Sequence, residues 1–189
     1  KKTAGVVEVY ARSHSAPTKH QWFCKVKDMV MEFSAEQIEI LGDMELYGEN
    51  MFRIHSQEYG NLTNLFYLFG VRDRQEDRWL SWDEVVEVAA IFGMDTVPVV
   101  FRGVFVSTDQ LSRNLTNWAA EHSQFGSAAL PEGFVVRHTP SFPNSEFGKH
   151  IAKRVRANFN QLDETTKEFT DDQKCDLGPP LPARPRLLV

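Results

Sequence analysis

Short stretches with strand-like alternation are the feature that most constrains how this chain can fold. In each of them valine, isoleucine or aromatic residues alternate with polar ones, the pattern of a strand with one buried face. Strands outnumber helical segments and do not alternate strictly with them, which argues against a doubly wound parallel sheet. The predicted strands span residues 6–13, 45–51, 66–73, 96–102, 133–139 and 151–157.

The predicted helices are residues 20–33, 83–92 and 109–121. The first two have apolar residues on one helical face, and the third follows Ser107 and Thr108 as its cap and ends before a glycine-containing loop. The second begins at "SWDE", where Ser81 and Glu84 are spaced to form a capping box. Taken with the strands, these helices predict an α+β fold in which largely antiparallel sheets are flanked by helices.

The domain organisation follows from length and composition. A chain of 189 residues with 42% hydrophobic and 25% charged residues has enough apolar side chain for a sizeable core. We expect one domain over residues 1–170. From residue 171 the periodicity is lost and four of the nine prolines gather, so residues 171–189 are expected to form an extended tail.

Features of membrane, secreted and zinc proteins are missing from the sequence. No apolar run approaches the roughly 20 residues of a membrane span, and no signal peptide is visible. Cys24 and Cys175 lie far apart, outside any CxxC pattern, and offer no zinc site. We therefore expect a cytoplasmic protein that does not contact a membrane.

Charge is unevenly distributed. The net charge is −5, yet residues 132–156 carry five cations against Glu132 and Glu146. A polyanion would meet one local basic site in an otherwise acidic molecule, although a solvated basic strand explains the same charges. The five cations are Arg137, Lys149, Lys153, Arg154 and Arg156.

Several predicted strands carry residues that suit a ligand better than a core. In "MELYGENMFRIHS" the hydrophobic alternation stops at Gly48 and Glu49. The glycine permits close approach of a ligand, and the carboxylate can accept from hydroxyls or help hold a metal. A β-bulge explains the pair equally well. Arg12 in "YARSH" is either a phosphate ligand or an edge arginine with a carboxylate partner.

Aromatic and basic positions add to this set. The rings of "LFYLFGVRD" are core residues or, for Phe69, a stacking face for a nucleobase. In the last strand Arg154 and Arg156 share one face and form a fork for a polyphosphate, while Lys153 takes the opposite face. In a straight strand Glu132 and Arg137 also point to opposite faces, so they meet one ligand only if that strand bulges or ends.

Taken in order, these motifs resemble the ATP-dependent RNA ligases. That family belongs to the covalent nucleotidyltransferase superfamily, which also includes DNA ligases and mRNA capping enzymes. The resemblance runs from about residue 7 to residue 160 and rests on five motifs in family order. "YARSH" is similar to the segment after the nucleophile, and "YGEN", "FYLFGV", "EGFVVR" and "IAKRVR" are similar to motifs III, IIIa, IV and V.

The resemblance implies a ligase adenylation domain, ATP-grasp-like, that uses ATP and Mg²⁺ or Mn²⁺ to join RNA ends. A lysine attacks the α-phosphate of ATP to give lysyl-AMP, AMP passes to an RNA 5′-phosphate, and a 3′-OH displaces it. Carried onto this chain, Glu49 binds the ribose beside Gly48, Phe69 stacks on adenine, and Glu132 helps place the metal. The remaining cations contact phosphates: Arg12, Arg137, Lys153, Arg154 and Arg156.

The sequence departs from the family pattern at the nucleophile. "KTAG" imitates the expected Lys-x-Asp-Gly spacing but has Ala4 in place of the acid, so we expect the reactive lysine to lie outside this sequence rather than at Lys2. Arg137 stands where lysine is more frequent. Two alternatives stay open: a catalytically inactive nucleotide- or RNA-binding module of the same fold, and a DNA ligase or capping-type enzyme. A further repair domain or partner protein is also possible.

Overall fold

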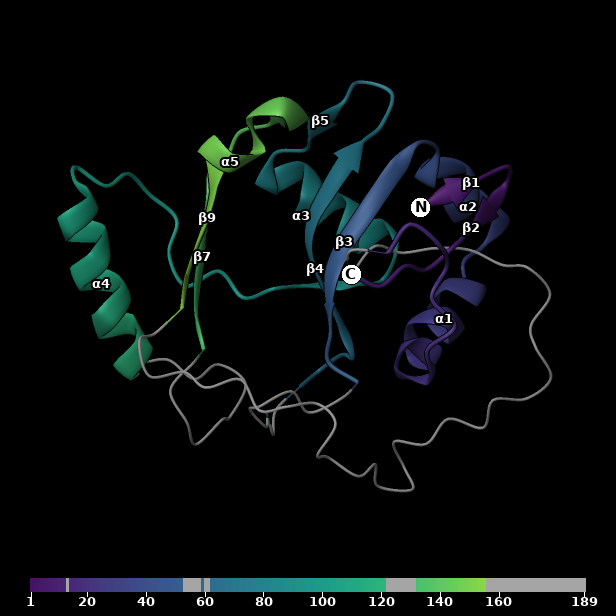
Figure 1. The fold of residues 1–189 in the computed structure, drawn as a ribbon, viewed down its shortest axis with the longest axis horizontal. Helices are drawn as coiled ribbons and strands as arrows, with labels where there is room; N and C mark the ends of the chain where they lie inside the picture. Colours follow the sequence, from purple (N-terminus) through teal and green to yellow (C-terminus); the bar gives the residue numbers. More distant parts are fainter. Residues whose placement is uncertain (13, 53–58, 60–61, 122–131, 156–189) are drawn as a thin grey trace.

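The computed structural model describes residues 1–12, 14–52, 59, 62–121 and 132–155. These residues form a mixed α+β structure with five α-helices and largely antiparallel sheets (Figure 1), so the predicted α+β class is confirmed, and the nucleotidyltransferase fold stays a prediction. None of the described helices is long and apolar enough to cross a bilayer. The predicted tail, residues 171–189, lies outside the described residues.

The central sheet is built on two long antiparallel strands, β3 (Met44–Asn50) and β4 (Phe66–Asp73). Short strands extend it beyond β4 in the order β3-β4-β5-β8, and one more strand pairs with β4 in parallel. These short strands are β5 (Arg78–Trp79), β6 (Asp95–Thr96) and β8 (Phe142–Pro143).

Helices cover the sheet, and two of them begin at capping boxes. Ser34 and Gln37 cap α2, and Ser81 and Glu84 cap α3, each pair as a full capping box. The predicted helix 20–33 is observed as a 3-10 turn followed by α1, and α2 was not predicted. The elements are η1 (Gln21–Phe23), α1 (Cys24–Met31), α2 (Ala35–Leu41), α3 (Trp82–Ile91) and α4 (Thr108–Glu121).

Two hairpins stand outside the central sheet. One, near the N-terminus, turns at Ala4 and Gly5, whose φ angles are 49° and 78°. The other carries two of the predicted motifs and is joined by a short helical segment. The elements are β1 (Lys2–Thr3), β2 (Val6–Val7), β7 (Gly133–Arg137), β9 (Ile151–Val155), η2 (Asn144–Glu146) and α5 (Phe147–His150).

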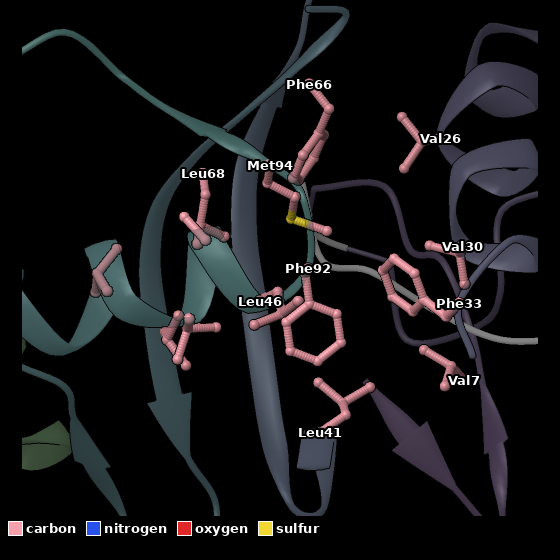
Figure 2. Packing of buried hydrophobic residues seen from close by; sticks show 14 of the residues in the cluster. Val7, Val26, Val30, Phe33, Leu41, Leu46, Phe66, Leu68, Phe92 and Met94 are labelled. Carbon is pink, nitrogen blue, oxygen red and sulfur yellow. The ribbon is translucent and has the colours of Figure 1, made fainter. Parts of the chain in front are cut away.

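One hydrophobic core lies between the inner face of the central sheet and the helices α1 and α3 (Figure 2). Leu46 and Leu68 come from the sheet, and both are fully buried. Phe33 and Phe92 meet across the helices with ring centroids 4.9 Å apart. Within β4, Phe66 and Leu68 alternate into this core, whereas the buried side chains of Glu45 and Tyr67 lie on the other face of the sheet.

Two predicted strands are shorter than expected. The strand predicted over 96–102 ends at Thr96, because Pro98 has no backbone N–H to continue the ladder after Val97 donates to the Leu68 carbonyl at 2.9 Å. The strand predicted over 6–13 is regular only at Val6–Val7, with an isolated bridge at Tyr10.

Candidate functional site

A β-bulge exposes one aromatic ring of β4. In the β3–β4 ladder Tyr47 pairs with Gly70 and Gly48 pairs with Leu68, so Phe69 is an extra residue without an opposite partner in that ladder. Phe69 is 37% exposed, whereas the three strand residues before it are buried. The arrangement presents an aromatic side chain at the surface of an otherwise buried strand, as a base-stacking residue requires.

Packing inside the sheet explains why residue 48 is a glycine. A Cβ atom built on it would lie 2.2 Å from Cζ of Phe66 and 2.7 Å from the carbonyl oxygen of Tyr67. The space beside the glycine is therefore filled by the Phe66 ring, which is 1% exposed. The predicted role of Gly48 in clearing room for a sugar stays a prediction.

Glu49 is exposed and lies at the end of β3, opposite Tyr67. The same region holds Glu132, because both carboxylates act on Tyr59. Burial, followed by the negative charges of Glu132 and Glu49, raises the pKa of the Tyr59 phenol. The charges of carboxylates from two separate motifs therefore both act on one tyrosine.

The β7–β9 hairpin supplies the cation that faces these carboxylates. Lys153 Nζ lies 2.8 Å from Oε1 of Glu132 and donates to it. Both side chains stay accessible, at 57% and 42% of their full exposure. The strand register pairs Val135 with Lys153 and Arg137 with Ile151, so Lys153 and Arg137 share one face of the hairpin.

Arg154 occupies the opposite face, as strand parity predicts. Its Nη1 donates to Oγ of Ser112 on α4 at 2.7 Å. Arg156, the second arm of the predicted fork, lies outside the described residues. Of the candidate cations in motif V, Lys153 is therefore the one that contacts Glu132.

Arg137 turns toward the central sheet. Its guanidinium donates to the carbonyl oxygens of Leu80 at 2.7 Å and Phe69 at 3.2 Å, and lies over the rings of Trp82 and Phe142. Burial lowers the pKa of Arg137, although a guanidinium stays charged at any physiological pH. Its predicted contact with phosphate stays a prediction.

Arg12 is exposed in the loop after β2, and the described residues show no contact between its side chain and the carboxylates of Glu49 or Glu132. Its carbonyl oxygen accepts a hydrogen bond from His14 Nδ1 at 2.8 Å. The role of Arg12 as a phosphate ligand stays a prediction.

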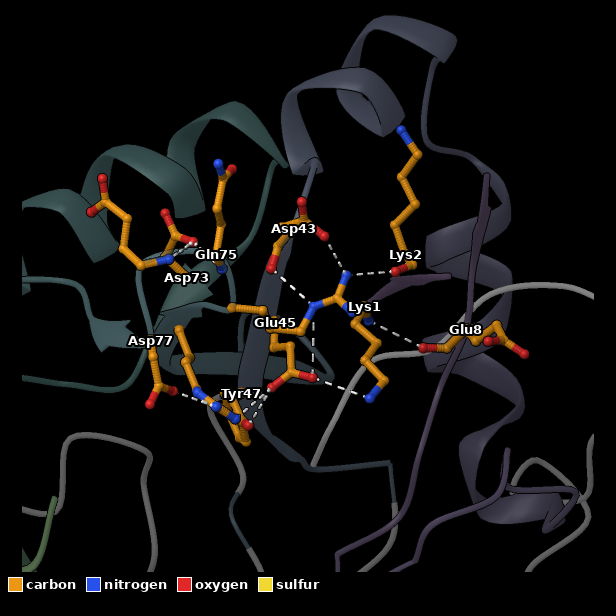
Figure 3. A network of polar contacts seen from close by, with 12 residues as sticks. Lys1, Lys2, Glu8, Asp43, Glu45, Tyr47, Asp73, Gln75 and Asp77 are labelled. Atoms are coloured by element: carbon orange, nitrogen blue, oxygen red, sulfur yellow. Dashed lines mark hydrogen bonds and ion pairs between the residues drawn. The ribbon is translucent and has the colours of Figure 1, made fainter. Parts of the chain in front are cut away.

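The N-terminal hairpin holds Lys2 at the other end of β3. Arg74 donates to the Lys2 carbonyl at 2.8 Å and to Oδ1 of Asp43 at 3.0 Å, just before β3 begins (Figure 3). Met44 and Glu49 are five residues apart on β3, or about 16 Å at the usual strand rise. The glycine of "KTAG" is explained by the hairpin turn, where φ is positive.

The same end of the sheet contains a buried carboxylate that serves the fold. Glu45 is 3% exposed, accepts from the Tyr47 hydroxyl at 2.9 Å and lies 3.4 Å from Nη1 of Arg72 (Figure 3). Burial and the Glu45 charge raise the pKa of Tyr47. These groups neutralise one another, so this network is structural and leaves no charge for a ligand.

The donor set suits a metal that arrives with a phosphate ligand. Among the described residues no group of three or more His, Cys, Asp or Glu side chains is placed to hold a metal ion. Mg²⁺ commonly takes one or two carboxylates and completes its shell with water and substrate phosphates. Glu132 fits that role when a nucleotide is bound.

Two features of the site were missed from the sequence. Tyr59 was not singled out, although a tyrosine following the polar stretch "RIHSQE" breaks the pattern expected of a simple loop. The second is the cation–π contact of Arg137 with Trp82 and Phe142, two rings from separate parts of the chain. Only the tertiary structure brings these two rings to one guanidinium.

Comparison with known proteins gives one match. The model of a family described as RNA ligase matches residues 1–155, which is most of the chain and ends with β9. No curated protein matches the chain, and no solved structure does.

Proposed function

The chain belongs to the RNA ligase family, and from this premise we propose that it joins RNA 3′-OH and 5′-phosphate ends with ATP in a nucleotidyltransferase fold. The observation that carries the proposal is the ion pair between Lys153 of β9 and Glu132, whose Nζ and Oε1 lie 2.8 Å apart, with the charges of Glu132 and Glu49 both acting on Tyr59. Phe69 adds an exposed aromatic ring on β4.

Each residue has a defined task in this proposal. Phe69 stacks on adenine, a contact worth about 1–3 kcal/mol per base, and Glu49 accepts from the ribose hydroxyls. Lys153 neutralises negative charge on the phosphates when its ion pair with Glu132 opens. Arg154 and Arg12 contact the RNA backbone in this proposal, where cations fix its position without reading its sequence.

The reaction is two transfers of an adenylyl group followed by sealing. A lysine Nζ attacks the α-phosphorus of ATP and pyrophosphate leaves. The AMP then passes to the RNA 5′-phosphate, and the 3′-OH displaces it to form the phosphodiester. A divalent metal, when bound with ATP, would neutralise phosphate charge during these steps, and Glu132 is the residue that would hold it.

Incubation of the full-length protein, with the segment that carries the reactive lysine, and ATP labelled at the α-phosphate tests the proposal. We expect a covalent label on lysine with the acid lability of a P–N bond. Glu49→Ala and Glu132→Ala should each abolish labelling while the circular dichroism spectrum stays unchanged. Glu87→Ala, which removes an exposed carboxylate from α3, is the matched control and should label normally. Normal labelling of both site variants would refute the site.

A second candidate is a nucleotide- or RNA-binding module without ligase activity. It would apply if no other lysine serves as the nucleophile, because Lys2, the lysine of "KTAG", is held at the far end of β3 from Glu49. Nucleotide binding measured by titration, together with no covalent label, would establish this alternative. Nicked RNA, nicked DNA and triphosphate-ended RNA offered in parallel would separate an RNA ligase from a DNA ligase or capping enzyme.

A further inference from the structure

We propose that Arg137 is a positioning residue, which fixes the β7–β9 hairpin against β4 so that Glu132 and Lys153 are held beside Phe69 and Glu49. This inference rests on the proposed function for its activity measurement, and it assigns Arg137 a role other than phosphate binding.

The first line of evidence is the set of groups that Arg137 contacts. Three of its N–H groups donate to backbone carbonyls: Nη2 to Leu80 at 2.7 Å, Nη1 to Phe69 at 3.2 Å and Nε to His138 at 3.4 Å. Within the described residues it forms no ion pair with a carboxylate. These bonds already use three of the five N–H donors of the guanidinium, one on each of its nitrogens, so the full fork is not available to a phosphate.

The second line of evidence is the pair of aromatic rings over which the guanidinium lies. The guanidinium carbon lies 5.6 Å from the ring centroid of Trp82 and 5.8 Å from that of Phe142. Both rings are buried, at 8% and 2% exposure. A planar guanidinium can stack on such rings and donate in its plane at the same time, which a lysine ammonium cannot do.

The third line of evidence is where the hairpin is attached. Other hydrogen bonds that hold the hairpin region to the central sheet and α3 lie near α5. There the Trp82 amide donates to the Thr139 carbonyl at 2.8 Å, and the Asn144 amide donates to the Asp77 carbonyl at 2.8 Å. Among the ties described, the Arg137 bond to Phe69 anchors β7 most directly to the bulge of β4.

The position of this attachment determines how far Glu132 can move. Glu132 lies five residues before Arg137, or about 16 Å along an extended strand. A small rotation at the anchored end therefore moves Glu132 by a large amount relative to Glu49. Because catalytic groups tolerate displacements of only about 1 Å, loosening this anchor should slow chemistry more than it weakens nucleotide binding.

Arg137→Lys separates positioning from phosphate binding, because it keeps the charge and loses the planar fork. As a positioning residue, Arg137→Lys should lower kcat for adenylyl transfer about tenfold or more, with KM for ATP changed less than about threefold. As a phosphate ligand, it should raise KM and keep kcat, and that result would overturn the proposal. Arg102→Lys, which alters an exposed arginine bonded to Asp83, is the control and should change neither constant.

Hydrogen exchange gives a readout independent of activity. In Arg137→Lys the amides of β7 and β9 should exchange faster, while those of β3 and α1 keep their protection. Unchanged exchange in the hairpin would overturn the proposal even if the protein proves to be no ligase. Absence of label in the wild type together with faster exchange in the variant would instead reject the ligase function and retain the anchor.

Discussion

At the scale of single residues, Phe69 shows how a functional side chain is separated from the core within one strand. Phe66 and Phe69 lie three positions apart in β4, and their exposures are 1% and 37%. The difference comes from the bulge opposite Gly48, which leaves one ring in the core and turns the other outward.

Alanine substitutions at these two positions should therefore affect different properties, nucleotide binding for Phe69 and stability of the fold for Phe66. Phe69→Ala should weaken nucleotide binding by about 1–3 kcal/mol and lower the free energy of unfolding by less than that. Phe66→Ala should lower the free energy of unfolding by about 3–5 kcal/mol. Calorimetric titration and chemical denaturation measure the two quantities. A collapse in stability for Phe69→Ala would mean that this ring is a core residue.

Gly48→Ala should destabilise the fold by about 1–3 kcal/mol, because the new methyl group overlaps the Phe66 ring and the Tyr67 carbonyl. Urea denaturation measures the effect. Gly148→Ala is the control, since a Cβ there meets nothing within 4 Å. If the Phe66 ring is the cause, Phe66→Leu should cost less in the Gly48→Ala background than in the wild type. Equal costs would show that the two sites are independent.

At the scale of elements, two helices begin with the same motif but differ in charge. The capping box of α2 uses Gln37, whereas that of α3 uses Glu84, which also accepts from Nη1 of Arg78 at 3.2 Å. Burial alone would raise the pKa of Glu84, but hydrogen bonds from Ser81 and the charge of Arg78 outweigh it and lower the pKa. Only the start of α3 should therefore respond to acid.

The sign of this response follows from the lowered pKa. The contribution of Glu84 to stability is present above the pKa of an unfolded glutamate, near 4.3, and is lost as the pH falls through the lower folded value. Glu84→Gln keeps the capping acceptor and should flatten the fall in the free energy of unfolding between about pH 5 and pH 3 by less than about 1 kcal/mol. Glu87→Gln, on the exposed face of α3, should leave the pH profile unchanged.

The elements also show what the sequence could predict. The long strands β3, β4, β7 and β9 and the helix α3 were predicted because each repeats a clear period, and α4 was predicted from its cap. The helix α2 was missed although "SAEQ" is a capping box, since its seven residues give too short a window for the helical period. The β-bulge offered as one explanation of Gly48 and Glu49 is observed at Gly48, whereas the contact between Lys153 and Glu132 depends on strand register, which alternation alone does not fix.

At the scale of the whole molecule, the net charge of −5 makes RNA binding depend on a few local cations. Arg12, Lys153 and Arg154 are exposed, and three contacts to single-stranded phosphates imply a slope of about −2 in a plot of log K against log salt concentration. Arg154→Ala should reduce that slope by about 0.7. Lys149→Ala, in an exposed pair with Glu146, is the control and should leave it unchanged. Fluorescence anisotropy with a short RNA measures both.

The β7–β9 hairpin has a further consequence for how the protein behaves in concentrated solution. In the described part of the chain β7 pairs with β9 alone, so its outer edge offers free N–H and C=O groups next to Val135, which is 65% exposed. An open edge beside an exposed valine is where a strand from another molecule can add, whereas the cations of β9 discourage such pairing on its side. Self-association should therefore begin at β7, and Val135→Lys should raise the concentration at which light scattering detects it.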